Sequence, residues 1–65
     1  MGRTEEKDVQ NLRTALQKKE DSIHSYTEQI RAFNDPLINA VLEGILHNEM
    51  RRKVEIEEQL ERMSA

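Results

Sequence analysis

The residues of this chain best placed to do chemistry are three charged side chains that interrupt apolar heptads: Lys19, Glu49 and Arg52. The Glu49 carboxylate could ligate a metal ion, but Lys19 and Arg52 already carry the positive charge that a metal would supply. A buried carboxylate needs a charged partner, and either cation can provide it. We therefore predict a buried polar layer of Lys19, Glu49 and Arg52 that sets the register between helices, with no metal there.

A slipped register would build a metal site from other side chains. Glu20 or Asp21, with His24 close by, could then join Glu49 and bind iron. A shift of one residue turns a side chain by about 100°, away from the inward stripe of its helix, so this site remains the alternative. His24 and His47 both fall outside the apolar stripes, and we expect them to be exposed.

The remaining nucleophiles do not assemble a catalytic site. The chain has no cysteine, so it offers neither a thiolate nucleophile nor a disulfide. Ser22, Ser25 and Thr27 lie beside His24 in the sequence but diverge around a helix. We therefore expect a non-enzymatic protein without catalytic residues and, apart from the iron alternative, without a cofactor.

Apolar residues at alternating spacings of three and four predict a long first helix at about residues 5–33. Lys19 is the one charged member of this stripe. The stripe consists of Val9, Leu12, Leu16, Lys19, Ile23, Tyr26, Ile30 and Phe33.

The sequence Asn34-Asp35-Pro36 predicts the turn. Asparagine tolerates the left-handed conformation that often ends a helix. Aspartate is a preferred N-cap, and proline is preferred at the first helical position. The turn at 34–36 is followed by a second helix at about residues 36–63, and so short a connection makes the two helices antiparallel neighbours.

The second helix has a similar stripe, with a broader apolar band in its first half. Its predicted inward positions are Ile38, Leu42, Ile45, Glu49, Arg52, Ile56, Gln59 and Met63, flanked by Val41, Leu46 and Leu60. With the turn near Asp35, the numbers of facing residues sum to about 71, which places Lys19 opposite Arg52. Apolar residues then face apolar residues, so we expect one all-α hairpin domain over residues 1–65.

The broad apolar band also predicts self-association, because one partner helix cannot cover it. Folded alone, a chain of 65 residues buries little apolar surface and is near the margin of stability. We expect a homodimer that forms a four-helix bundle, or a higher oligomer, through Tyr26, Val41, Leu42, Ile45 and Leu46. An adaptor that docks this band on a different protein is a further alternative.

The charge composition narrows the choice of partners. Acidic and basic residues are mixed and the net charge is −3, which gives no electrostatic reason to bind nucleic acid or an anionic membrane surface. No apolar run approaches the length of a membrane span, and the first residues are polar. We expect a cytoplasmic protein.

The chain from Ile23 to Leu60 resembles the ferritin-like superfamily, especially rubrerythrin-like and encapsulated-ferritin-like hairpins. Asp35 and Pro36 open the second helix, apolar residues follow, and Glu49 comes fourteen residues after Asp35. In the family, an acid at this place begins a Glu-x-x-His metal motif. Its helix partner carries a metal-binding glutamate seven residues before a tyrosine, and Tyr26 is similar to that tyrosine.

Two ligands of the family are replaced in this chain. Lys19 stands seven residues before Tyr26, and Arg52 stands three residues after Glu49. The resemblance therefore implies a ferritin-like ancestry with a Lys–Glu–Arg layer in place of a di-iron site. It leaves as an alternative an iron-binding or ferroxidase protein whose site lies between subunits.

Overall fold

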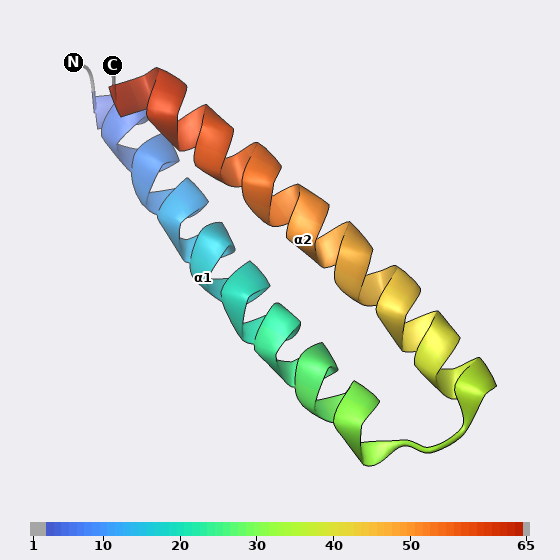
Figure 1. The fold of residues 1–65 in the computed structure, drawn as a ribbon. Coiled ribbons are helices and arrows are strands. Elements are labelled where there is room, and N and C mark those ends of the chain that lie inside the picture. The colour runs from blue at the N-terminus through green and yellow to red at the C-terminus, as the bar shows by residue number, and fades with distance from the viewer. Residues whose placement is uncertain (1–2, 65) are drawn as a thin grey trace.

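Two antiparallel helices form the fold, shown by a computed structural model that describes residues 3–64. Helix α1 covers Arg3–Ala32 and helix α2 covers Pro36–Ser64. The start of α1 and the end of α2 therefore lie at the same end of the hairpin (Figure 1). The predicted all-α fold is confirmed for the described part of the chain, which contains no strand. Residues 1, 2 and 65 of the predicted domain lie outside it.

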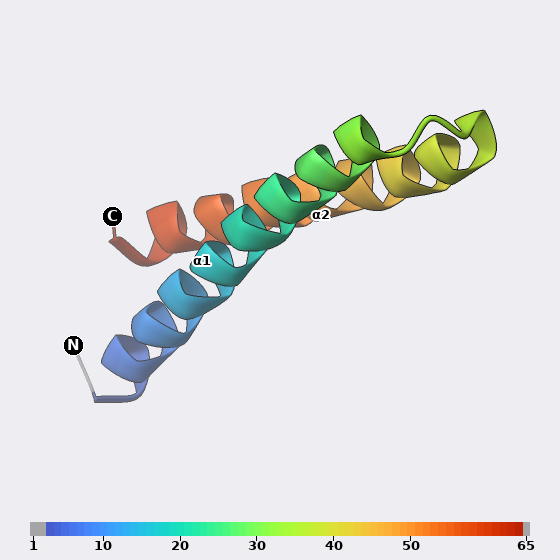
Figure 2. The same cartoon turned by 90° about the horizontal axis from the view of Figure 1, so that it is seen from below.

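The hairpin is a slender rod with dimensions of 50 × 14 × 13 Å. The helices lie side by side in one view and cross at an angle in the other (Figures 1 and 2). A layer only two helices thick can bury side chains along a single seam.

Asp35 caps α2. Its Oδ1 atom accepts a hydrogen bond of 2.9 Å from the backbone N–H of Leu37, and its carbonyl accepts one of 3.0 Å from the N–H of Asn39. Pro36 occupies the first helical position, where no N–H is needed. The Asn39 amide also donates to the Phe33 carbonyl at 3.0 Å, which satisfies a group at the end of α1.

The loop closes without a left-handed residue. Among residues 3–64 none has a positive φ, so the left-handed conformation suggested by Asn34 is not used. Helix α1 ends at Ala32, and the side-chain amide of Asn39 binds the carbonyl of Phe33, the first residue after it.

Replacing Asp35 by alanine should lower the free energy of unfolding by about 1 kcal/mol, because the Leu37 N–H loses its partner. Thermal unfolding followed by circular dichroism measures the change. Asn34→Ala is the matched control, since Asn34 is the exposed neighbour in the same loop. Equal shifts of Tm in the two variants would contradict the capping role.

The seam between the helices is formed mainly of half-buried side chains. Leu42, at 9% exposure, is the most buried. From α1 the seam contains Val9, Leu12, Ala15, Leu16, Lys19, Ser22, Ile23, Tyr26, Thr27 and Ile30. From α2 it contains Asn39, Leu42, Ile45, Leu46, Glu49, Lys53, Ile56, Leu60 and Met63. The predicted stripe of α1 lies in this seam as far as Ile30.

The predicted stripe of α2 needs a correction in its second half. Lys53 and Leu60 enter the seam, whereas Arg52 and Gln59 are exposed. The two choices differ by one residue, or about 100° around the helix. The apolar side chain of Leu60 decides between them, because burying it is favourable and burying Gln59 is not.

Candidate functional site

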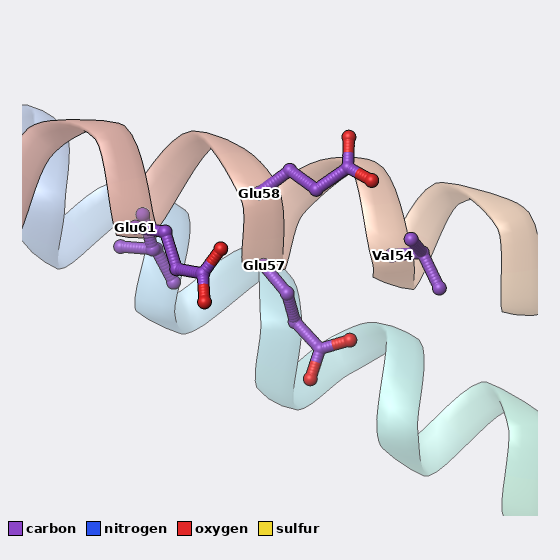
Figure 3. Close-up of a pocket in the computed structure, with 5 residues that line it drawn as sticks. Val54, Glu57, Glu58 and Glu61 are labelled. Atoms are coloured by element: carbon purple, nitrogen blue, oxygen red, sulfur yellow. The ribbon is translucent and has the colours of Figure 1, made fainter.

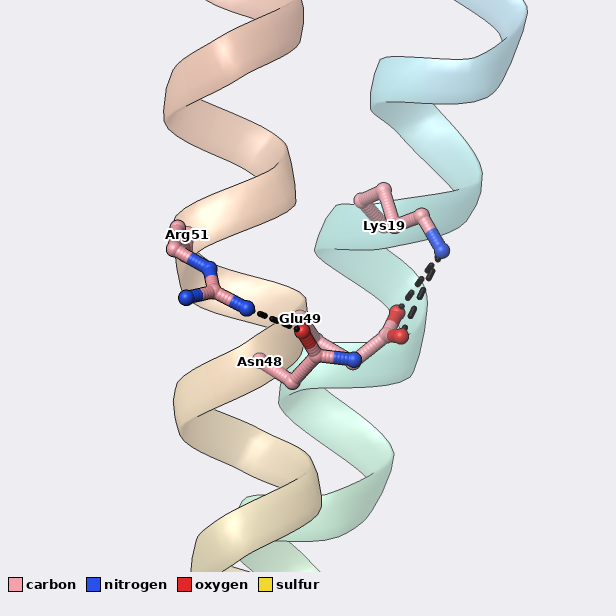
Figure 4. A network of polar contacts seen from close by, with 4 residues as sticks. All are labelled: Lys19, Asn48, Glu49 and Arg51. Carbon is pink, nitrogen blue, oxygen red and sulfur yellow. Dashed lines mark hydrogen bonds and ion pairs between the residues drawn. The ribbon is translucent and has the colours of Figure 1, made fainter.

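Lys19 and Glu49 form an ion pair across the seam, near the middle of the hairpin (Figure 4). The Lys19 Nζ atom lies 3.1 Å from Oε2 and 3.3 Å from Oε1 of Glu49, so it contacts both carboxylate oxygens. The side chains are 30% and 15% exposed, respectively. The pair is therefore half-buried rather than buried, and it lies within a mainly apolar seam.

A second ion pair lies beside the first with its charges reversed between the helices. Glu20 of α1 and Lys53 of α2 form a salt bridge with an Nζ–Oε1 distance of 3.9 Å. The side chains are 43% and 34% exposed, so water screens this pair more than the first. Each helix thus contributes one acid and one base to a polar layer at mid-seam.

Arg52 does not join this layer in the single chain. It is exposed, and Lys53 occupies the seam position that the sequence had suggested for Arg52. The neighbouring arginine, Arg51, donates a hydrogen bond of 3.1 Å to Asn48 on the outer surface of α2 (Figure 4). The observed layer is therefore Lys19–Glu49 with Glu20–Lys53, and not Lys19–Glu49–Arg52.

The alternative iron ligands do not converge on one point in the single chain. Glu20 contacts Lys53, and Asp21 accepts a hydrogen bond of 3.0 Å from Gln17. His24 is exposed. Among the described residues, no group of three His, Cys, Asp or Glu side chains is placed to hold a metal ion.

Of the predicted interface residues, Val41 is the one left widely accessible. Its side chain is 64% exposed, whereas Leu42 is buried within the hairpin. Tyr26, Ile45 and Leu46 are half-buried in the seam. The sequence stripes could not separate residues that α1 covers from residues that it leaves open, because both kinds fall within one broad apolar band.

The structure reveals an apolar surface at the loop end, of which the sequence alone assigned only Val41 to an interface. We name it the loop-end patch: Phe33, Leu37, Ile38 and Val41. Leu37 is 79% exposed and Phe33 is 44% exposed. A hollow lined by Leu37, Ile38, Val41 and Leu42 lies within it. The position at which the first helix ends could have revealed this surface, because Phe33 falls beyond the last residue of α1.

The terminal end of α2 has a different surface. Val54, Glu57, Glu58, Leu60 and Glu61 line a shallow hollow there (Figure 3). Three carboxylates and two apolar side chains line this hollow, so an apolar partner would have to desolvate charges in order to dock.

Replacing Gly44 by alanine should raise the free energy of unfolding by about 1 kcal/mol, because glycine weakens a helix interior. A Cβ atom built at Gly44 meets nothing within 4 Å, so the hairpin itself does not require the glycine. Urea unfolding at fixed protein concentration measures the gain, with Asn48→Ala on the same exposed side of α2 as the control. If Gly44→Ala lowered the free energy of unfolding and Asn48→Ala did not, another part of the assembly would have to pack closely against Gly44.

Neither described helix is apolar over a stretch long enough to cross a membrane. A comparison of the chain with family models, with curated proteins and with solved structures gives no match to any of them.

Proposed function

We propose that this chain is a non-enzymatic helical hairpin whose role is structural, and that it works as an assembly of its own copies. The observation that carries this proposal is the surface that a single copy leaves open. The accessible area is 5222 Å² for a mass of 7.7 kDa. A compact monomer of that mass exposes about 4,300 Å².

The excess, about 900 Å², is close to the roughly 800 Å² that each partner contributes to a standard protein interface. Apolar side chains make up part of it, since Leu37 and Val41 are more than half exposed. Covering them with a second hairpin would turn a two-helix layer into a four-helix bundle with an enclosed core.

We further propose that the hairpin has a ferritin-like ancestry and that an ion pair has replaced its metal site. The support is the pairing of Lys19 with Glu49, since these are the positions at which the resemblance expects two metal-binding carboxylates. A lysine within 3.1 Å of Glu49 supplies the charge that a cation would otherwise bring to that carboxylate. An assembly of two copies would hold two such pairs.

Light scattering over a range of protein concentrations tests the assembly. We expect a dimer mass or a multiple of it at micromolar concentration. A stable monomer of 7.7 kDa with full helix content would contradict the proposal.

Titration with ferrous iron in air separates the structural role from the iron-binding alternative. We expect neither stoichiometric iron nor oxidation faster than in buffer. Lys19→Glu restores a carboxylate where the resemblance expects one, and therefore serves as the comparison variant. Stoichiometric iron on the unaltered protein would contradict the proposed loss of the metal site.

A further inference from the structure

The exposed apolar side chains of this hairpin gather at one end. The loop-end patch contributes four of the six large hydrophobic residues that remain exposed in the described chain. The other two, Met50 and Val54, lie further along α2. Met50 stands thirteen residues after Leu37, and Val54 stands thirteen residues after Val41. Thirteen residues correspond to a rotation of about 140° around a helix of 3.6 residues per turn, so Met50 and Val54 lie on a different side of α2 from the patch.

One stripe of α2, which runs along the edge of the seam and shares Ile45 with it, changes from apolar to polar along the helix. Its spacing of three and four residues places its members on one side of the helix. The members are Ile38, Val41, Ile45, Asn48, Arg52, Glu55 and Gln59. The stripe is apolar up to Ile45 and polar from Asn48 onward. An apolar partner therefore has a matching surface only in the half of the stripe next to the loop.

We propose that a second copy of this chain docks on the loop-end patch, with the two hairpins side by side and their loops at the same end. This inference rests on the proposed self-assembly and specifies its surface and orientation. With a two-fold axis parallel to the rods, the same segments of both copies meet, so each loop-end patch contacts the other.

The opposite orientation pairs unlike surfaces. If the hairpins overlapped fully with their loops at opposite ends, Val41 of one copy would meet the polar half of the same stripe in the other. Arg52 and Glu55 would then lose water without gaining a partner of opposite charge. Placing the loops together brings the apolar halves of the two stripes against each other, and Arg52 and Glu55 then lie in the polar half of the contact.

The two hairpins must overlap along their length in order to form a contact of standard area. The helical part of this patch, from Pro36 to Val41, is six residues, and at about 1.5 Å per residue it covers about 9 Å. The rod is 50 Å long, so an end-to-end contact through this segment alone covers only a fraction of the face. A contact of standard size needs nearly the whole length of that face.

Spin labels measure the orientation directly. The chain has no native cysteine, so Asn34→Cys labels the loop and Gln10→Cys labels the terminal end of α1 without interference. Both residues are exposed. In the proposed dimer, each label lies within about 30 Å of its counterpart, since packed helix axes are only about 10 Å apart.

Two other results would overturn the orientation. A separation near the 50 Å length of the rod between the Asn34 labels would mean that the loops lie at opposite ends. A short Asn34 distance with a Gln10 distance well beyond 50 Å would mean that the hairpins meet end to end. Failure of the assembly itself is distinguishable from both, because it gives a monomer mass and no dipolar signal between copies.

Two exposed valines provide a matched test of the surface. Val41, in the patch, is 64% exposed, and Val54, outside it, is 50% exposed, so serine at either site costs the isolated hairpin little. Val41→Ser should raise the dimer dissociation constant by about tenfold or more, because the contact loses the same apolar side chain from both copies. Val54→Ser should change it by no more than about twofold. An equal effect at both sites, or a larger one at Val54, would overturn the assignment of the patch.

Discussion

Replacing Leu42 by alanine should lower the free energy of unfolding by about 2 to 3 kcal/mol, the largest loss expected from any single truncation in the chain. Leu42 is the most buried apolar side chain, at 9% exposure. Truncating a buried leucine removes the apolar contacts of its methyl groups and leaves a cavity that the neighbours only partly fill. In a chain of 65 residues, a loss of this size is a large part of the total stability.

Urea unfolding monitored by circular dichroism at one fixed protein concentration measures the effect, since assembly adds to the apparent stability. Leu12→Ala is the matched control, because Leu12 is a half-buried leucine of the same seam. We expect its loss to be about half as large. A larger loss at Leu12 would mean that the core of the folded protein lies toward the termini.

Replacing Lys19 alone by leucine should lower the free energy of unfolding by about 1 to 2 kcal/mol. The Glu49 side chain is only 15% exposed, so loss of its partner leaves a carboxylate with little access to water. Removing one member of a buried pair is costly because the remaining charge is uncompensated. The cost here stays below that of a fully buried pair, since Lys19 is 30% exposed.

Replacing both Lys19 and Glu49 by leucine should restore the stability to at least that of the unaltered protein. Two apolar side chains of suitable size then continue the seam, and the charges of this pair are no longer desolvated. The double-mutant cycle of urea unfolding gives the coupling energy between the two residues. A coupling energy of zero would show that the pair behaves like an exposed surface pair.

The same double variant also tests whether the ion pair sets the register. A polar layer in an apolar seam disfavours other alignments of the helices, because a shift would separate its charges. The Lys19→Leu, Glu49→Leu protein should therefore be stable but give a broader distribution of masses in light scattering. A single sharp mass equal to that of the unaltered protein would mean that the apolar residues alone fix the alignment.

The two helices and the turn between them could be predicted from local sequence. The stripe that runs from Val9 to Ile30 follows one heptad pattern, and the structure places the members of this stripe along the seam. Asp35 and Pro36 determine the start of α2, since the cap and the missing N–H act within a few residues. Such features depend on neighbours in the chain, so the sequence alone reveals them.

The inward face of α2 could be predicted only in part. Leu42, Glu49, Ile56 and Met63 lie in the seam as expected, because they repeat every seven residues. Between them, Arg52 and Lys53 are both basic, and their chemistry gave no reason to prefer either. Periodicity defines a stripe to within about one residue, and the packing of α1 selects one of the two.

By itself the sequence determined that this chain forms two long helices, where the turn between them lies, and that charged residues interrupt the seam. Only the tertiary structure decided that Lys19 contacts Glu49 while Arg52 stays outside, and that Leu42 is buried while Leu37 and Val41 remain open. The reason is physical. Helix formation and capping are governed by residues a few positions apart, whereas burial and ion pairing depend on the rotation of one helix against the other. That rotation is fixed by the sum of contacts along the whole seam rather than by any single residue.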